Sequence, residues 1–314
     1  MGPGKNSSVY VAGHRGLVGS AILRRLRETG YTNLALRTSS ELDLADSAAV
    51  EDFFSTEKPE FVFLAAAKVG GILANDTFPG DFIRDNLAIQ LNVIDAARRH
   101  GAKKLMFLGS TCIYPRDARQ PMIENDILTG PLEPTNSAYA VAKIAGLEMI
   151  RAYRDQYGFN GISIMPTNLY GPGDNFDLET SHVLPALIRR FHDAKTSGAH
   201  EVAIWGTGKP LREFMHADDL ADAAVWLMEN YDDAQMLNVG TGEEISILEL
   251  ARLVAKVVGF KGGIVTDTSK PDGTPRKLCD ITRLRALGWK PKIGLEEGIR
   301  STYEWFEEHV AVHH

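Results

Sequence analysis

The sequence contains little cysteine, no long apolar run and no excess of positive charge. Its 314 residues include two cysteines, Cys112 and Cys279, which are too few for a disulfide scaffold and suggest a reducing compartment. No apolar run reaches the roughly 18 residues of a membrane span, and the first residues have neither a signal core nor a myristoylation pattern. The formal net charge of −7 gives no global field for nucleic acid. We therefore expect a cytoplasmic protein without membrane or nucleic-acid partners.

Short apolar runs alternate with helical patterns through the first half of the chain. This alternation predicts a parallel sheet with helices on both faces, an α/β doubly wound fold of Rossmann type. The expected strands are Val9–Ala12, Asn33–Arg37, Phe61–Ala67 and Lys104–Leu108, and the expected helices include Ser47–Glu57 and Phe82–His100.

The pattern changes near Gly171, where glycine and proline become frequent. A helix over His182–Lys195 stands apart from the strand rhythm, and Pro271–Pro275 is rich in turn residues. We expect a smaller C-terminal substrate-binding lobe. The predicted cofactor domain is 1–170 plus about 213–243, and the predicted lobe is about 171–212 plus 244–314.

A glycine-rich turn follows the first expected strand and precedes a helical pattern. It carries Gly13, Gly16 and Gly19 at G-x-x-G-x-x-G spacing. In a dinucleotide-binding fold such glycines allow a sharp turn, close approach of the pyrophosphate and close packing of the helix. The helix start presents free N–H groups to the phosphates. His14 and Arg15 lie inside the turn, where they are either solvated or, for Arg15, placed to meet an extra phosphate.

The second expected strand ends without an acidic residue. NAD sites place a carboxylate there for the ribose hydroxyls, but this chain has Arg37, Thr38 and Ser39. Arginine and hydroxyl groups suit a 2′-phosphate, which a carboxylate would repel. Together with Arg15, this favours NADP over NAD, unless Arg37 is merely an exposed surface residue.

Tyr139 and Lys143 stand four residues apart and share one face if the segment is helical. An ammonium nearby would stabilise the phenolate and lower the tyrosine pKa toward working pH. Such a tyrosine can exchange a proton with a substrate oxygen, which Ser110, at the end of a strand, could also contact. The spacing alone is common, so the interpretation of Tyr139 and Lys143 as a catalytic pair depends on the glycine turn and Ser110 that precede them.

Two further residues could exchange protons with a substrate. One is Cys112, since a thiol, with a reference pKa of about 8.5, suits proton transfer near neutrality, although free cysteines are often simply small buried hydrophobes. His182 would lie near a helix start, where it is either an acid or a surface capping residue.

Several stretches resemble the extended branch of the short-chain dehydrogenase/reductase superfamily, whose members act on nucleotide sugars with bound NAD(P). The resemblance covers essentially the whole chain and includes Asn168–Pro172 and Arg212–Asp219. Dehydratases of this branch carry an Asp-Glu pair where this chain has Cys112 and Ile113, and simple 4-epimerases have an inert small residue in place of Cys112. The resemblance therefore indicates another reaction.

Together, the stretches resemble the GDP-L-fucose synthase family. They read AGHRGLVGSAI, AAAKVGGI, GSTCIYP, GPLEPTNSAYAVAKIAG, PTNLYGP, SHVLPALIRRFH, WGTGKPLREFMH and KPDGTPRK. The resemblance implies epimerisation of GDP-4-keto-6-deoxy-D-mannose at C3 and C5, followed by NADPH reduction at C4, with no metal. It also implies a homodimer, for which Phe82–His100 and Ala138–Tyr157 are the expected interface helices.

The resemblance assigns Ser110, Tyr139 and Lys143 to reduction and Cys112 and His182 to epimerisation. The expected substrate contacts are Ser110, Cys112, Asn168, Arg190, Trp205, Arg212, Lys277 and Asp280, with Trp205 alternatively in the lobe core. The expected cofactor contacts are Gly13, His14, Arg15, Gly16, Leu17, Val18, Gly19, Arg37, Ser39, Asp43, Leu44, Ala66, Leu108, Gly109, Ser110, Thr111, Tyr139, Lys143, Pro166, Thr167, Asn168, Leu169 and His182. Bacterial members have arginine at the position of Ser39, so Arg15 and Arg37 would carry more of the phosphate binding here.

Two rival functions use the same scaffold. Another nucleotide-sugar epimerase or reductase would leave Cys112 dispensable and prefer a different base over guanine. A non-catalytic NADP-sensing or nucleic-acid-associated protein would not need Tyr139 and Lys143 together, and the acidic net charge argues against it.

Overall fold

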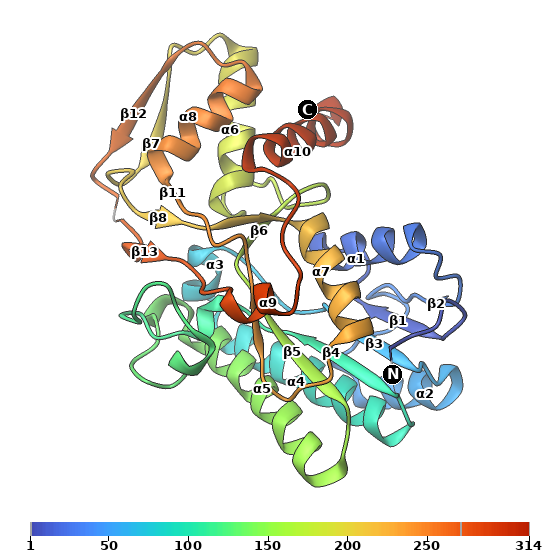
Figure 1. The fold of residues 1–314 in the computed structure, drawn as a ribbon. Coiled ribbons are helices and arrows are strands. Elements are labelled where there is room, and N and C mark those ends of the chain that lie inside the picture. Colours follow the sequence, from blue (N-terminus) through green and yellow to red (C-terminus); the bar gives the residue numbers. More distant parts are fainter. Residues whose placement is uncertain (1, 271, 314) are drawn as a thin grey trace.

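The protein is described by a computed structural model that covers residues 2–270 and 272–313. Its central element is a six-stranded sheet in the order β10-β5-β4-β3-β1-β2, in which every neighbouring pair is parallel (Figure 1). The strands are β1 Val9–Ala12, β2 Leu34–Ala35, β3 Phe61–Leu64, β4 Lys104–Leu108, β5 Gly161–Pro166 and β10 Leu237–Val239. This confirms the predicted α/β fold class.

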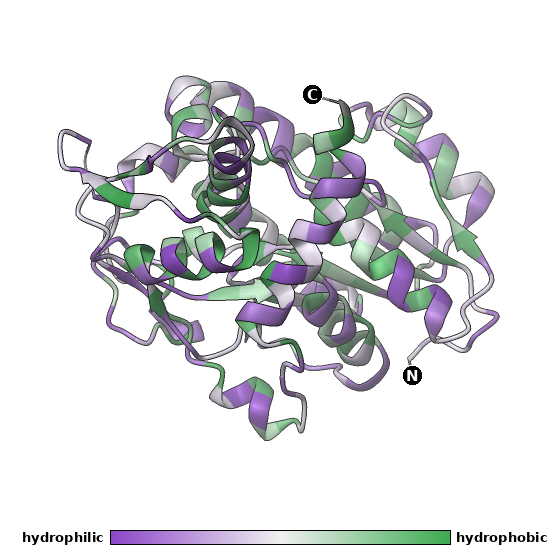
Figure 2. Cartoon of the chain, turned by 90° about the horizontal axis from the view of Figure 1, so that it is seen from above, coloured by the Kyte–Doolittle hydropathy of each residue, from purple (hydrophilic) through white to green (hydrophobic). Residues whose placement is uncertain are grey.

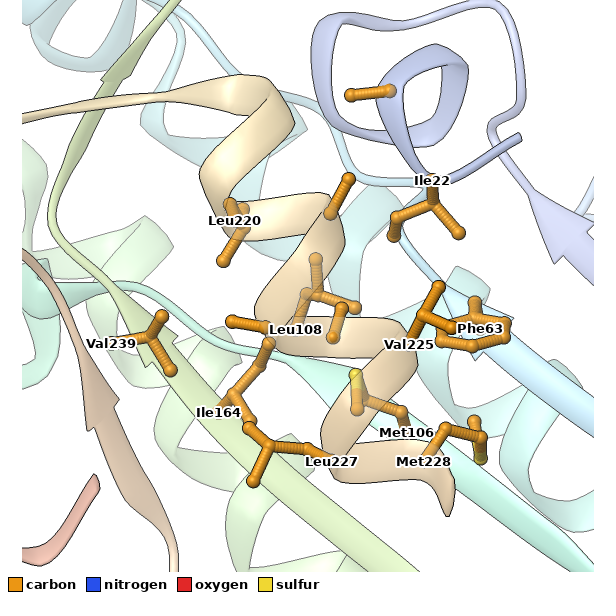
Figure 3. Packing of buried hydrophobic residues seen from close by; sticks show 14 of the residues in the cluster. Ile22, Phe63, Met106, Leu108, Ile164, Leu220, Val225, Leu227, Met228 and Val239 are labelled. Atoms are coloured by element: carbon orange, nitrogen blue, oxygen red, sulfur yellow. The ribbon is translucent and has the colours of Figure 1, made fainter. Parts of the chain in front are cut away.

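Alternate residues of the strands face two different hydrophobic clusters. Val9 and Val11 pack with helices α1 and α7, whereas Tyr10 and Ala12 pack with α2, α4 and α5. Figure 3 shows α7 side chains such as Leu220 and Val225 lying over the sheet residues Met106 and Ile164. The sheet is thus covered on both faces by α1 Leu17–Glu28, α2 Ser47–Glu57, α4 Pro79–Arg99, α5 Ser137–Tyr157 and α7 Ala217–Asn230.

Most predicted elements are found, with shifts at their ends. Strands Val9–Ala12 and Lys104–Leu108 and helix Ser47–Glu57 have the predicted bounds, the helix because Asp46 accepts the N–H groups of Ala48 and Ala49 at 2.9 and 3.2 Å. The strand expected over 33–37 is reduced to β2, an edge strand paired only with β1. The strand expected over 61–67 ends at Leu64, and the helix expected from 82 begins three residues earlier, at Pro79.

A second group of elements lies to one side of the sheet (Figure 1). Its hydrophobic cluster draws on helices α6, α8 and α10 and includes Phe191, Leu250 and Phe306. The helices are α6 Val183–Ser197, α8 Ile247–Val258 and α10 Leu295–His309, and the strands are β6 Asn168–Tyr170, β7 Glu201–Trp205, β8 Leu211–Arg212, β9 Phe214–His216, β11 Ile245–Ser246, β12 Gly263–Asp267 and β13 Arg276–Lys277. The short helix α9 Thr282–Ala286 packs instead against β10 of the central sheet. Pro271, in the predicted turn-rich segment, lies outside the described residues.

Hydrophilic and hydrophobic bands alternate along the helices in Figure 2, as expected of amphipathic helices that cover a core. Within residues 2–270 and 272–313, no helix is long and apolar enough to cross a membrane. The remaining elements are the short helix α3 Ile72–Thr77 and the 3₁₀ turns η1 Thr111–Ile113, η2 Glu124–Asp126, η3 Pro134–Asn136 and η4 Ala311–His313.

The strand order reverses at β1. From β1 the chain goes to β2 on one side and then returns past β1 to β3 on the other. In open α/β sheets, ligands bind outside the carboxyl ends of the strands at such a reversal. Gly13 follows β1 and Ala65 follows β3, and the N–H of Ala65 donates to the carbonyl of Ala12 at 3.1 Å. The predicted cofactor turn therefore lies at the reversal point.

Candidate active site

The glycine turn has the geometry that its spacing predicts. Gly13 has a φ of +83°, and a Cβ there would lie 2.9 Å from the Cα of Ala66. A Cβ on Gly19 would lie 2.0 Å from the Gly13 carbonyl oxygen, so a side chain would push α1 away from the strand. Both glycines are required by the close approach of backbone segments.

The start of α1 offers its N–H groups to an anion. Gly16 is the N-cap and supplies no side-chain cap, and no acidic residue lies in the first turn. A Cβ on Gly16 would meet only the Gly13 oxygen, at 3.5 Å, so the outer side of the turn is open. Uncapped N–H groups and the positive end of the helix dipole fit a pyrophosphate. His14 lies beside them with its pKa lowered, mainly by burial and also by the charge of Arg15.

The turn after β2 holds an acid that the sequence reasoning missed. Glu41 Oε2 accepts hydrogen bonds from the N–H and hydroxyl of Thr38 at 2.7 and 2.8 Å. These bonds lower the Glu41 pKa, and Arg37 and Arg15 contribute further through their charges. Arg37 is also engaged, because its guanidinium pairs with Glu57 and donates to the Leu36 carbonyl at 2.8 Å. Arg15 is exposed, and the charges of both Arg15 and Arg37 act on the Glu41 carboxylate.

Ser110 and Cys112 follow β4 and lie beside Tyr139. The Ser110 hydroxyl accepts the N–H of Cys112 at 3.3 Å, at the start of the η1 turn. Ser110 also hydrogen-bonds to Tyr139, which lowers the Tyr139 pKa, and the nearby Cys112 thiol raises it. Three predicted catalytic residues are thus in one cluster. Cys112 is half-buried, whereas Cys279 is the buried thiol.

The predicted lowering of the Tyr139 pKa is wrong, because burial raises it. Tyr139 is buried, and burial is the largest influence on its pKa and raises it. Lys143 Nζ lies 5.8 Å from the Tyr139 ring centre and donates to the Leu108 carbonyl at 2.9 Å, and burial lowers its own pKa to about 8. Desolvation outweighs the weak attraction between these two groups. Tyr139 therefore stays a neutral O–H donor near neutral pH.

His182 is the N-cap of α6 and is exposed. Desolvation by the protein atoms around it lowers its pKa. Two residues earlier, the Thr180 carbonyl accepts the N–H of Gly71 at 3.1 Å. This contact joins the His182 segment to the loop after β3.

Trp205 is on the surface and not in the lobe core. Its side chain is 58% exposed at the end of β7. Arg190, from α6, places its guanidinium carbon 5.4 Å from the Trp205 ring centre, and the Lys270 ammonium lies 5.7 Å from the same centre. Two cations beside an exposed indole form a surface that suits a base and its phosphates.

Arg212 lies on β8, with Lys277 at the paired position of β13. Burial lowers the Arg212 pKa, and the charge of Asp272 raises it. Asp272 accepts the Thr207 N–H and hydroxyl at 2.8 and 2.7 Å, which ties its segment to the loop after Trp205. Arg212 is therefore a partly desolvated cation, and it has no short ion pair among the described residues. Its charge is thus available to an anionic ligand.

Glu213 is a buried carboxylate that sequence reasoning did not select. It is 0% exposed, and its oxygens accept the N–H groups of Thr241, Gly242 and Cys279 at 2.7, 2.8 and 2.9 Å. Its carbonyl accepts the Asn168 amide at 2.8 Å. Glu213 thus joins the segments that carry Arg212, Asn168 and Lys277. In the sequence Glu213 stands between Arg212 and Phe214, and neither neighbour signals a buried carboxylate.

The other predicted residues lie near the carboxyl ends of the strands or are hydrogen-bonded to other protein groups. A Cβ on Gly109 would lie 2.2 Å from Met165, and Thr167 donates its N–H to the Val239 carbonyl at 3.0 Å. The Asp280 carboxylate accepts the Thr282 N–H at 2.8 Å, so it is occupied at the start of α9. Buried Thr111 lies in η1, exposed Ser39 lies in the turn after β2, Pro166 ends β5, Leu169 lies in β6, and Asp43 and Leu44 precede α2.

A cavity of about 1160 Å³ lies elsewhere, between the α8 region and residues 285–295. It is lined by Phe214 and Trp289 and by charged side chains of both signs, including Arg252 and Glu249. It contains none of the predicted catalytic residues. The candidate reactive centre is therefore the cluster of Ser110, Cys112 and Tyr139 and not this cavity.

Residues 9–240 match the model of the NAD dependent epimerase/dehydratase family, and the chain belongs to this family. Two relatives carry a more specific name. GDP-L-fucose synthase 1 of Arabidopsis thaliana is 60% identical over 98% of this chain and 95% of its own length. GDP-L-fucose synthase of Escherichia coli is 55% identical over 96% of each chain. These relatives confirm the resemblance predicted from the motifs.

A solved structure shows the same fold. The GDP-mannoheptose C4 reductase MlghC from Campylobacter jejuni, with NADP bound, superposes with a TM-score of 0.90. It is 42% identical and covers 98% of this chain and 100% of its own.

Proposed function

We propose that the protein converts GDP-4-keto-6-deoxy-D-mannose to GDP-L-fucose by epimerisation at C3 and C5 and reduction at C4. The observation that carries this proposal is the convergence of Ser110 and Cys112 on the buried phenol of Tyr139. The uncapped start of α1 lies at the same carboxyl end of the parallel sheet. The relatives named GDP-L-fucose synthase support the substrate, and MlghC supports NADP as cofactor.

The cofactor would be held by the glycine turn, with Arg15 and Arg37 on the 2′-phosphate and with Lys143 and Asn168 nearer the nicotinamide. The remaining cofactor contacts are those expected from the sequence. The open outer side of Gly16 and the free N–H groups of α1 fit a pyrophosphate. NADPH, when bound, supplies the hydride for C4.

Tyr139 and Ser110 donate hydrogen bonds to the C4 ketone oxygen and stabilise an enolate at that carbonyl. Cys112 takes the proton from the carbon next to the ketone, and His182 returns one on the opposite face. Because burial keeps Tyr139 protonated, it can give its proton to the alkoxide formed on reduction. The lowered His182 pKa keeps the imidazole mostly neutral at pH 7, so its acid form is more abundant at lower pH.

The GDP part of the substrate would lie along the second lobe. Arg190, Arg212 and Lys277 contact the diphosphate, Trp205 stacks on the guanine or lies under the sugar, and Asp280 contacts a hydroxyl. This assigns 1–170 plus about 213–243 to the cofactor domain and about 171–212 plus 244–314 to the substrate lobe. Calorimetric titration of GDP should show a clear affinity loss in Arg212→Ala, and unchanged affinity would remove Arg212 from the site.

We also propose a homodimer in the cytoplasm. Helices α4 and α5 pack against each other and leave Leu87, Leu91 and Val141 exposed by 36%, 54% and 45%. Apolar side chains on adjacent helices suit a second copy. Leu91→Lys should shift the mass measured by light scattering from dimer to monomer. The two free cysteines fit a reducing compartment.

The decisive assay supplies GDP-4-keto-6-deoxy-D-mannose with NADPH or NADH and reads product stereochemistry by NMR. We expect GDP-L-fucose from the wild type. Cys112→Ser should slow epimerisation more than it weakens NADPH binding. A reduced product that keeps the manno configuration at C3 and C5 in the wild type would retain the reductase and contradict the epimerase, and a normal rate in Cys112→Ser would contradict the base assignment.

A further inference from the structure

Asn75 holds a buried oxygen for which the described protein provides no donor. The residue is 7% exposed on α3, and its amide nitrogen donates to the carbonyls of Gly70 and Gly71 at 2.8 and 3.0 Å. Only the NH₂ group can satisfy two carbonyls, so the orientation of the amide is fixed. Its Oδ1 has no hydrogen-bond partner among the residues that the structure describes. A buried acceptor of this kind costs stability unless something donates to it.

Two more buried acceptors come from neighbouring segments. Ser181 Oγ and Asn136 Oδ1 also have no partner within the described part of the chain. The Ser181 segment adjoins Asn75, because Gly71 donates to the Thr180 carbonyl at 3.1 Å and its Cα faces Ser181. Asn136 belongs to η3, which packs against α3. Although Asn136 is the N-cap of α5, its side chain does not cap the helix.

These three segments border the proposed reactive centre. His182 directly follows Ser181, and Tyr139 is in the first turn of α5, after Asn136. The Tyr139 ring meets Phe82 edge-on at 6.4 Å, and the Phe82 ring lies 3.2 Å from the Cβ position of Gly70. Asn75 is therefore connected to Tyr139 by successive contacts through Gly70 and Phe82.

The type of unmatched atom restricts the ligand. Amide oxygens only accept hydrogen bonds, and a hydroxyl can accept one. Phosphate and ketone oxygens also only accept, so they would leave Asn75 and Asn136 unsatisfied. A ligand here must carry several O–H or N–H donors. A hexose ring has such hydroxyls next to its reacting carbons.

We propose that Asn75, Asn136 and Ser181 form a subsite that accepts hydrogen bonds from the hydroxyl groups of the substrate's hexose ring. The subsite rests on the proposed function and adds residues that select the sugar. The same donor chemistry is present in the ribose and carboxamide of the cofactor, so the experiment compares the two sources.

The test uses Ser181→Ala, with Ser163→Ala as its matched control. Ser163 also has a buried hydroxyl without a partner in the described structure, but it lies within β5. Removing either hydroxyl should leave the melting temperature unchanged or slightly higher, because no protein hydrogen bond is lost. Calorimetry should show that Ser181→Ala weakens GDP-mannose binding roughly three- to tenfold, the size of one lost hydrogen bond, while GDP and NADPH binding stay within about twofold. Ser163→Ala should change none of these affinities.

Ser181→Ala combined with Asn136→Ala should weaken GDP-mannose binding further and raise KM more than it lowers kcat. Unchanged GDP-mannose affinity in the double variant would overturn the subsite, as would an equal loss for GDP or a loss confined to NADPH. Wild-type turnover of the keto sugar, measured alongside, tests the proposed function separately. Normal turnover with unaltered KM in the double variant would reject the subsite and leave the function intact. A wild type that binds GDP-mannose no tighter than GDP would also reject the subsite.

Discussion

A buried lysine lies at each end of the strands of the central sheet, one at the amino edge, where the strands begin, and one at the carboxyl edge, where they end. The two lysines differ in their partners. At the amino end of β4, Lys104 is 0% exposed and donates to the carbonyls of Met228 and Tyr231 at 2.8 and 2.5 Å, with Asp232 at 2.8 Å. At the carboxyl edge, Lys143 is 4% exposed and donates to the Leu108 carbonyl at 2.9 Å.

The difference in partners indicates a structural role for Lys104 and a ligand-binding role for Lys143. Lys104 closes the carbonyl end of α7, where a positive charge stabilises the helix, so its ammonium holds the fold together. Lys143 donates to one carbonyl, and burial brings its pKa to about 8. Burial lowers the Lys104 pKa as well, but there the charge of Asp232 opposes the shift. A lysine matched by carbonyls and a carboxylate stabilises the fold, whereas one with a single carbonyl partner among the described residues can serve a ligand.

The largest expected effect is at the carboxyl edge. Tyr139→Phe should lower kcat about 10²- to 10⁴-fold, because it removes the proton donor and leaves the ring packing unchanged. NADPH affinity and melting temperature should stay near wild type. Tyr114→Phe is the control, since the buried Tyr114 hydroxyl donates to Asn238 at 2.5 Å. If Tyr114→Phe lost as much turnover as Tyr139→Phe, the loss would not be specific to the Tyr139 hydroxyl.

At the amino edge, Lys104→Met should reduce the free energy of unfolding by about 2–3 kcal/mol, because buried carbonyls lose a charged donor. The activity of the folded fraction should not change. Urea denaturation measures the loss. Lys103→Met, which alters an exposed lysine paired with Glu60, should change stability by less than about 0.5 kcal/mol. Equal losses in both variants would contradict the structural role of Lys104.

The pH dependence of NADPH binding should sharpen the contrast. The Lys143 ammonium is present below its pKa of about 8 and is lost above it. The dissociation constant for NADPH should therefore rise as the pH increases through about 8. Lys143→Arg keeps its charge over this range and should give a flat profile between pH 7 and 9.5. A rise of the same size in Lys143→Arg would assign the titration to another group.

The smallest expected effect concerns cofactor choice. Glu41 faces Arg15 and Arg37, so Glu41→Gln should increase the preference for NADPH over NADH roughly two- to fivefold, an effect limited by solvent screening. The ratio of kcat/KM values for the two cofactors measures it, preferably at low salt. Glu51→Gln makes the same charge change at a carboxylate paired with Arg99 and should leave the ratio unaltered. A ratio that moves equally in both variants would point to net charge alone.

Local patterns predicted the carboxyl edge better than the amino edge. The glycine turn, the Tyr139–Lys143 spacing and Ser110 at a strand end are short-range signals, because their function depends on a few consecutive residues. Lys104 at the start of a strand gives no such signal. Its partners are more than 120 residues away, and only the packing of α7 brings them together.

The sequence by itself determined the fold class and the family, and it predicted the residues of the proposed reactive centre. Periodicity, glycine spacing and i, i+4 pairs follow from local backbone geometry. Only the tertiary structure decided that Tyr139 has a raised pKa, that Glu41 faces the two arginines and that Glu213 joins the substrate-side segments. It also brought together the segments that carry the unmatched oxygens of Asn75, Asn136 and Ser181. Burial and charge depend on which distant segments become neighbours, and these contacts form only when the chain packs.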